Sequence, residues 1–272
     1  MEDRDLLRRM DENFVAAYRE HTRHVDGGAV RERGSFTIFH VPLGDAMHNP
    51  ILVHGPAALS DVLAAAEGRR HEIGERFTIV TRAHADEHLR PGLEAAGYLG
   101  LIATPGMALR RERWRAPEAV APPGLEIRPV ATLDDARAYG EVVAEAFSVY
   151  GVARAAVRSF FTRRESLAGD AVQGFLGWID GVPVTAAALY VSGDVAGVGW
   201  VGTLPSFFGR RLAEAATARV VEEGFRRGLA LANLQASPLG EKLYARMGFE
   251  TPTRYNVFVP MPRSQGGGVA VK

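Results

Sequence analysis

The chain has 272 residues, 47% of them hydrophobic, with 32 acidic and 32 basic side chains and no cysteine. Balanced charge disfavours a nucleic-acid-binding protein, which needs excess Lys and Arg to contact phosphates. The lack of cysteine excludes disulfides, a thiolate nucleophile and cysteine–metal sites. The charged N-terminus is unlike a signal peptide, and no apolar run approaches the roughly 18 residues of a membrane span. We therefore expect a cytoplasmic protein with no nucleic-acid or membrane partner.

Apolar periodicity predicts alternating helices and strands in the first part of the chain. The expected elements are, in chain order, a helix over Leu6–Thr22, strands over Phe36–Val41 and Pro50–Val53, a helix over Ala57–Glu67, a strand over Phe77–Thr81, a helix over Asp86–Ala96 and a strand over Met107–Leu109. A charge cluster at Arg110–Arg115 and the prolines that follow it then indicate a linker.

The second part of the chain gives a clearer pattern. We expect a strand over Leu125–Val130, helices over Leu133–Phe147 and Ala153–Glu165, strands over Gly174–Ile179, Pro183–Val191 and Val195–Thr203, a helix over 210–227, a strand over Leu229–Gln235, a helix over Pro238–Met247 and a strand over Phe249–Val259. Asp180-Gly181 is a strong hairpin signal between two of these strands. The Pro- and Gly-rich end of the chain is predicted to be disordered.

Both parts close in the same order: strand, helix, a glycine followed by an aromatic residue, strand. The glycine–aromatic pairs are Gly97-Tyr98 and Gly248-Phe249. This similarity indicates a weak internal repeat with a period of about 110–150 residues. Two unrelated α/β segments with similar turns would produce the same pattern.

The most informative segment runs from the strand at Val195–Thr203 through Leu204-Pro205 and Gly209 into the helix at 210–227. A strand, a tight turn and a helix start leave unpaired backbone N–H groups at one point, which favours a bound anion. The helix dipole contributes only about 0.3–1 kcal/mol, so a phosphate there needs further contacts. Such units also occur in α/β proteins that bind nothing at the turn.

The second part resembles the GNAT (Gcn5-related) N-acetyltransferase family over about residues 124–259. The motifs that carry the resemblance are Val201-Gly-Thr-Leu-Pro205, Phe208-Gly-Arg-Arg-Leu-Ala213 and Leu243-Tyr244-Ala-Arg-Met-Gly248-Phe249. It implies an α/β (α+β) fold with two GNAT-like lobes, each a mixed, mostly antiparallel sheet flanked by helices. The expected division is a degenerate lobe at 1–115, a linker at 116–123, an acetyltransferase domain at 124–260 and a disordered tail at 261–272.

The resemblance implies acetyl-CoA as cosubstrate, with its pantetheine arm on the backbone of one strand and its pyrophosphate on the turn that follows. The implied cofactor-binding residues are Val201, Thr203, Phe208, Gly209, Arg210, Arg211, Leu212 and Ala213. Two of them depart from the family pattern. Phe208 replaces Arg or Gln, and Arg211 replaces a glycine whose missing Cβ leaves room for a phosphate. The arginine could pair with the phosphate or fill the groove and exclude the cofactor.

The resemblance places Tyr244 where it can protonate or stabilise the departing thiolate. The general base is open: the candidates within the second part are Glu145, Glu141, Asp194 and a water relay, and a histidine from the first part of the chain is a further alternative. No metal is required. His84 and His88 have the i,i+4 spacing of a metal pair, but a polar first helical turn explains them more simply.

We therefore expect an N-acetyltransferase that passes the acetyl group from acetyl-CoA directly to an amine in a ternary complex. The alternative is a non-catalytic GNAT-fold binding or scaffold protein with an impaired pyrophosphate site. The acceptor, a small-molecule or peptide amine, stays open. Dimers are common in the family, so a homodimer is also open.

Overall fold

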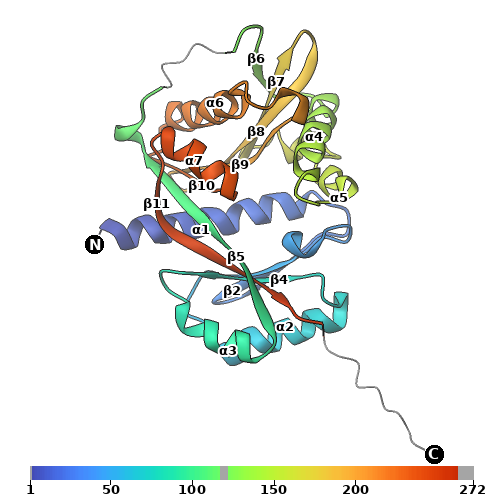
Figure 1. The fold of residues 1–272 in the computed structure, drawn as a ribbon, viewed down its shortest axis with the longest axis vertical. Helices are drawn as coiled ribbons and strands as arrows, with labels where there is room; N and C mark the ends of the chain where they lie inside the picture. The colour runs from blue at the N-terminus through green and yellow to red at the C-terminus, as the bar shows by residue number, and fades with distance from the viewer. Residues whose placement is uncertain (1, 117–121, 263–272) are drawn as a thin grey trace, which may run out of the picture.

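The computed structural model describes residues 2–116 and 122–262. These residues form an 11-stranded sheet in the order β1-β2-β3-β4-β11-β5-β10-β9-β8-β7-β6. Figure 1 shows two lobes on opposite sides of the long helix α1 (Glu2–Arg23). Most of the predicted linker at 116–123 and of the predicted tail at 261–272 lies outside the described residues. No described helix is long and apolar enough to cross a membrane.

The first part of the chain supplies α1, most of the first lobe and one strand, β5, that joins the second lobe. The elements after α1 are β1 (Ala29–Arg33), β2 (Phe36–His40), the 3-10 turn η1 (Ala46–His48), β3 (Pro50–Val53), α2 (Leu59–Ile73), β4 (Thr78–Arg82), η2 (Glu87–Leu89), α3 (Arg90–Ala95), β5 (Tyr98–Arg110) and η3 (Arg111–Arg113).

The second part supplies the remaining elements. These are β6 (Glu126–Pro129), α4 (Leu133–Ser148), α5 (Arg154–Ser159), η4 (Arg164–Ser166), β7 (Val172–Ile179), β8 (Val182–Ser192), β9 (Val195–Thr203), η5 (Pro205–Phe207), α6 (Leu212–Arg226), β10 (Leu231–Gln235), α7 (Pro238–Arg246) and β11 (Glu250–Pro260). Helix α4 begins with a capping box, in which Thr132 and Asp135 each accept a hydrogen bond from the other's backbone N–H.

Three sequence expectations differ from the structure. Strand β1 was not expected, because its exposed Arg-Glu-Arg run has no apolar alternation. The helix expected over 153–165 is only the short α5, since Phe160 caps it and both Phe160 and Phe161 turn into the core. The strand expected over 107–109 is the end of the much longer β5. Pro105-Gly106 resembles a turn in the sequence, but the strand continues through it. Glycine stands there because a Cβ at Gly106 would lie 2.7 Å from the Tyr255 ring.

The internal repeat is visible in the structure as two equivalent units, β3-α2-β4-α3-β5 and β9-α6-β10-α7-β11. In each unit the first two strands pair in parallel across a helix. The last strand of each unit follows a glycine with positive φ, 85° at Gly97 and 92° at Gly248. The chain therefore has two lobes that repeat the same arrangement of strands and helices.

The two lobes exchange their last strands. Strand β11, from the second part of the chain, lies between β4 and β5 and is antiparallel to both. Strand β5, from the first part, pairs with β10 of the second lobe. The exchange makes one continuous sheet out of two, and Figure 1 shows these two long strands crossing from lobe to lobe.

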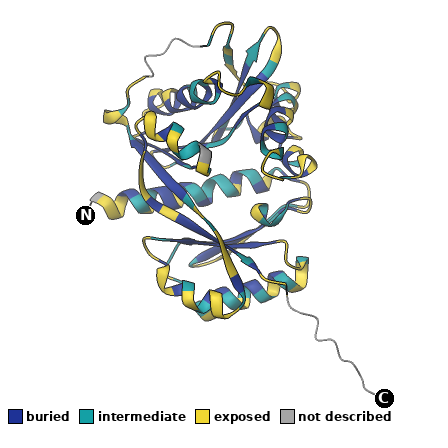
Figure 2. Cartoon of the chain, viewed as in Figure 1, coloured by how far each residue is buried: buried dark blue, intermediate teal, exposed yellow. Residues whose placement is uncertain are grey.

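Helix α1 is buried on two sides, which joins the lobes a second time. Leu6 and Met10 pack against strands of the second lobe, and Val15 packs against the first lobe. The Asn13 side chain donates hydrogen bonds to Tyr190 O (3.1 Å) and Ser192 Oγ (2.9 Å). A Cβ at Gly197 would lie 2.1 Å from Asn13 Oδ1, so glycine allows this close approach. Figure 2 shows the resulting buried strands on both sides of α1.

Candidate functional site

Strands β9 and β10 separate along their length, which leaves one edge of β9 unpaired. Their parallel pairing runs from Val195 opposite Leu231 to Gly197 opposite Asn233 and stops there. Strand β9 continues to Thr203, while β10 goes on pairing only with β5. Among the described residues, the backbone of 198–203, which includes Val201 and Thr203, thus has no strand partner on its β10 side. A strand edge of this kind can accept another extended chain as its hydrogen-bond partner.

Within this segment β9 contains a bulge. Its register with β8 shifts between the pair Ala188–Gly199 and the pair Ala186–Gly202, which leaves residues 200 and 201 outside the ladder. Trp200 has a left-handed backbone with φ of 50°. Bulky residues rarely adopt this conformation, and such strain is concentrated at functional sites.

The turn after β9 ends in a helix start with free donors. Gly209 and Arg211 have φ of 76° and 60°, and Arg211 is the N-cap of α6 without a side-chain cap. Among the described residues, no acceptor receives a hydrogen bond from the backbone N–H groups of residues 212–214. Arg211 therefore keeps the backbone shape that glycine adopts easily, and the helix N-terminus retains the donors that favour an anion.

The two bulky departures from the family pattern lie at the surface. Phe208 is 57% exposed. Arg211 donates from Nε to Glu214 Oε2 at 2.9 Å, and this hydrogen bond lowers the pKa of Glu214. Arg210 lies over the Phe207 ring, 4.8 Å from its centroid. Neither Phe208 nor Arg211 is buried between β9 and β10.

Tyr244 lies on α7 in the same apolar cluster as Val198 of β9, and Val201 packs against that cluster. Its ring is 6.0 Å from that of Phe249. Burial raises the pKa of Tyr244 to about 12. The nearby Thr217 hydroxyl acts in the opposite direction and lowers the pKa of Tyr244 in part. That hydroxyl has no hydrogen-bond partner of normal geometry among the described residues. The phenol is therefore protonated at any physiological pH.

Glu145 lies near the C-terminal end of α4, the helix that packs against the bulge. A Cβ at Gly202 would be 3.0 Å from the Ala146 Cβ. The Glu145 carboxylate is exposed and accepts two hydrogen bonds from Arg154, at 2.7 and 3.1 Å. These hydrogen bonds lower the pKa of Glu145. The carboxylate is thus ionised but only weakly basic.

Sequence reasoning missed the residues that surround the bulge. Trp200 donates from its indole Nε1–H to His21 Nε2 at 2.9 Å, and the His48 ring is stacked parallel to the indole at 6.1 Å. The signal in the sequence was Gly199 and Gly202 on either side of a tryptophan, since glycines inside a strand often mark a bulge. The histidines gave no local signal, because they come from α1 and η1.

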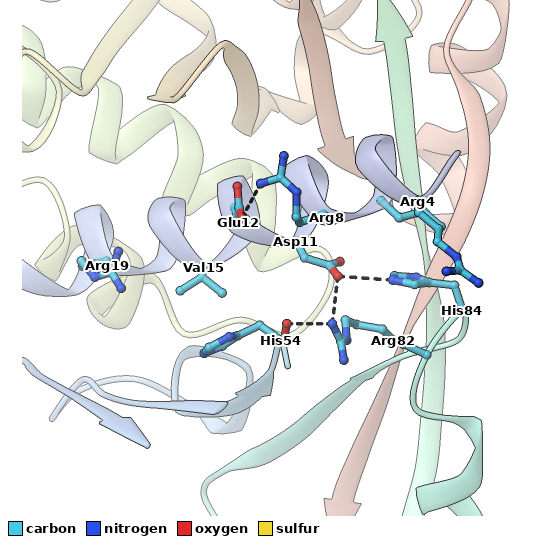
Figure 3. A pocket seen from close by; sticks show the side chains of 11 residues that line it. Arg4, Arg8, Asp11, Glu12, Val15, Arg19, His54, Arg82 and His84 are labelled. Carbon is cyan, nitrogen blue, oxygen red and sulfur yellow. Dashed lines mark hydrogen bonds and ion pairs between the residues drawn. The ribbon is translucent and has the colours of Figure 1, made fainter. Parts of the chain in front are cut away.

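A polar pocket of about 600 Å³ lies between α1 and the ends of β3 and β4 (Figure 3). At its base, the Asp11 carboxylate accepts from Arg82 Nη1 (3.2 Å) and from the Tyr255 hydroxyl (2.9 Å), and lies 3.3 Å from His84 Nε2. Arg82 also donates to Asp86 and to the carbonyls of His54 and Gly55. These charged groups satisfy one another and fasten α1 to the first lobe.

The His84 side chain belongs to this network and also lies 2.7 Å from Thr253 Oγ1 through its Nδ1. It precedes the helical turn that contains His88, so the two histidines do not share a helix face. Among residues 2–116 and 122–262, no group of three or more His, Asp or Glu side chains is arranged to hold a metal.

Solved structures share this fold over most of both chains. A GCN5-related N-acetyltransferase from Kribbella flavida has a TM-score of 0.68 at 19% identity, covering 92% of this chain and 96% of its own. A GCN5-related N-acetyltransferase from Sphaerobacter thermophilus has a TM-score of 0.60 at 21% identity, covering 83% of this chain and 80% of its own. A tandem GNAT protein from the clavulanic acid biosynthesis pathway, solved without acetyl-CoA, has a TM-score of 0.60 at 14% identity. The match covers 91% of this chain and 88% of its own.

No family model and no curated protein sequence matches the chain. At these identities the similarity to the solved structures is one of fold. It extends across both lobes.

Proposed function

We propose that this chain, which has the tandem fold of the GCN5-related N-acetyltransferases, transfers the acetyl group of acetyl-CoA to an amine through its second lobe. The observation that carries the proposal is the conjunction of an unpaired β9 edge with the free N–H groups at the start of α6. An extended pantetheine arm needs the first and a pyrophosphate needs the second. The exposed positions of Phe208 and Arg211 leave both features open.

In the proposed reaction, the neutral amine attacks the thioester carbonyl carbon, the C–N bond forms and the C–S bond breaks. The backbone N–H of Val201, beside the bulge, would stabilise negative charge on the carbonyl oxygen. The attacking nitrogen gives up one proton to solvent or to a base such as Glu145. The electron pair of the broken C–S bond leaves on sulfur as the thiolate of coenzyme A, which accepts a hydrogen bond or takes up a proton. No covalent enzyme intermediate is required.

Tyr244 is the proposed donor to the departing sulfur. Its pKa of about 12 lies well above the value near 8.5 that is typical of a thiol. Complete proton transfer from the phenol to the thiolate is therefore uphill. We propose that Tyr244 stabilises the thiolate mainly through a hydrogen bond, which the buried setting strengthens.

Calorimetric titration with acetyl-CoA tests the proposal. We expect binding in the micromolar range, and release of free thiol when a panel of amines is added. No heat at high micromolar acetyl-CoA would exclude the enzyme and favour a non-catalytic GNAT-fold protein. In the Tyr244→Phe variant we expect turnover to fall about 10²-fold or more with acetyl-CoA affinity within two-fold of wild type. Tyr98→Phe, in the first lobe, is the matched control, and equal turnover in the two variants would remove Tyr244 from the mechanism.

A further inference from the structure

The left-handed backbone of Trp200 requires an external restraint. This conformation costs a residue with a Cβ roughly 1–2 kcal/mol. Trp200 lies inside a strand, where nothing in its own sequence favours positive φ. Its neighbours Gly199 and Gly202 adopt the bulge more easily, yet the positive φ falls on the tryptophan.

Two hydrogen bonds and a set of rings provide that restraint. The indole Nε1–H donates to His21 Nε2 at 2.9 Å, and the Trp200 carbonyl accepts from the Tyr139 hydroxyl at 3.2 Å. Four further rings lie 5.3–6.1 Å from the indole by centroid distance: Phe147, Phe160, Phe161 and His48. His21 and His48 both come from the first part of the chain.

The His21 hydrogen bond has a fixed direction. To accept from the indole, Nε2 must be unprotonated, so the imidazole must be neutral. Burial, with the charge of the nearby His48 as a smaller cause, lowers the pKa of His21 to about 3. His21 is therefore an acceptor throughout the working range of pH.

The restraint on Trp200 determines where the next amide points. In a trans peptide the C=O and the following N–H point in opposite directions. The described residues contain no cis peptide bond. Holding the Trp200 carbonyl on Tyr139 of α4 therefore directs the Val201 N–H away from Tyr139. This is the same N–H that the proposed function assigns to the thioester oxygen.

We propose that His21 is a positioning residue: from α1 it holds Trp200 in its left-handed conformation and thereby orients the Val201 N–H of the second lobe. This inference rests on the proposed function for its catalytic consequence, but its structural content stands apart from activity. It gives the first lobe and α1 a specific role, which is to complete the bulge of the other lobe.

Two substitutions separate positioning from packing. His21→Leu keeps an apolar side chain of similar size but removes the acceptor. His21→Gln keeps an acceptor at a similar distance from Cα. His54→Leu is the control, since it removes a histidine that contacts Thr37 at 3.0 Å within the first lobe. Circular dichroism and thermal unfolding establish that each variant is folded.

The first readout needs no substrate. The protein has three tryptophans, so indole N–H resonances can be assigned with Trp200→Phe. We expect His21→Leu to move the Trp200 indole resonance upfield and to increase hydrogen exchange in residues 198–203 by about ten-fold or more. We expect His21→Gln and His54→Leu to leave both close to wild type. An unchanged Trp200 resonance together with unchanged hydrogen exchange in His21→Leu would overturn the inference. Equal changes of both quantities in His21→Gln and His21→Leu would also overturn it.

The second readout concerns catalysis. We expect kcat to fall about 10- to 100-fold in His21→Leu while acetyl-CoA affinity changes less than three-fold, and we expect partial recovery in His21→Gln. Equal losses in kcat and affinity would show a general structural defect and contradict the inference. If wild-type protein fails to bind acetyl-CoA, the proposed function fails, and the resonance and exchange measurements still decide the role of His21.

Discussion

At the scale of single residues, Arg211 combines a backbone conformation typical of glycine with a charged side chain. The backbone remains left-handed, and the guanidinium neutralises Glu214 in the first turn of α6. Without that arginine, the carboxylate would add negative charge where the proposed pyrophosphate lies. In the proposed complex the arginine would therefore act indirectly, by neutralising the charge of Glu214.

We predict that Arg211→Gly weakens acetyl-CoA binding about two- to five-fold, the range for a charge at an exposed helix N-terminus. The second change Glu214→Gln in the same protein should restore most of the affinity. Titration calorimetry of the four proteins in this double-mutant cycle measures the coupling. Tighter binding by Arg211→Gly alone would show that the arginine obstructs the site.

Glu145 can be tested as the base against a matched neighbour. Glu141 lies one turn earlier on α4 and pairs with Arg158 at 2.7 Å, much as Glu145 pairs with Arg154. Its pairing with Arg154 makes Glu145 a weak base, so any role in proton removal depends on its position at the end of α4, beside the bulge. On that ground we predict that Glu145→Gln lowers kcat at least ten-fold and that Glu141→Gln leaves it within two-fold. Steady-state kinetics at neutral pH check this. Similar kcat values for the two variants would show that Glu145 is not the base and that solvent removes the proton.

At the scale of elements, helix α6 carries a buried acidic group that links stability to pH. Glu223 is 7% exposed and meets Arg219, Arg226 and Arg227 at 3.4, 2.6 and 2.8 Å. The hydrogen bond from Arg226 is the largest cause that lowers the pKa of Glu223 to about 2. A carboxyl with a depressed pKa in the folded state stabilises the fold above its unfolded pKa, near 4.5.

We predict that this stabilisation is lost as the pH falls from about 4.5 to about 2. At pH 7, Glu223→Gln should lower the free energy of unfolding by roughly 1–3 kcal/mol, because hydrogen bonds to a charged group are removed. It should also flatten the dependence of stability on pH within that window. Denaturant unfolding across the pH range measures both effects. The exposed neighbour Glu222→Gln is the control, and identical curves for the two variants would contradict the prediction.

The elements also show what local sequence could and could not reveal. The bounds of β3 and β9 agree with expectation, because both are uninterrupted apolar runs between clear turns. Strand β1 has no apolar alternation, and β5 contains a Pro-Gly pair that reads as a turn. The Trp200 bulge and its contact with His21 depend on residues 179 positions apart, which no local pattern reports.

At the scale of the whole molecule, β5, β11 and α1 make the two lobes depend on each other. The repeat of the two units could be predicted from their glycine–aromatic pairs. The exchange of the final strands could not, because either pairing satisfies the same alternation of side chains. Only the three-dimensional register of β11 with β4 and β5 decides it.

We predict a single cooperative thermal transition for the full chain. Residues 1–115 and 124–260, produced separately, should each lack a stable fold, since each lacks one strand of its sheet. Mixing the two fragments should restore the structure, and for this the β11-deleted second fragment is the control. Calorimetry and circular dichroism check these outcomes. Two separate transitions, or a fragment that folds alone, would show that the lobes are independent.

The exchanged strand also constrains how the protein is made. During synthesis, β4 and β5 leave the ribosome well before residues 250–260 exist. Their pairing with β11 therefore has to wait for a segment more than half the chain length away. Until then the nascent first lobe exposes open strand edges that can pair with other chains. Chaperones that cover these edges should therefore raise the yield of folded protein, and slow translation of residues 111–249, which prolongs the intermediate, should lower it.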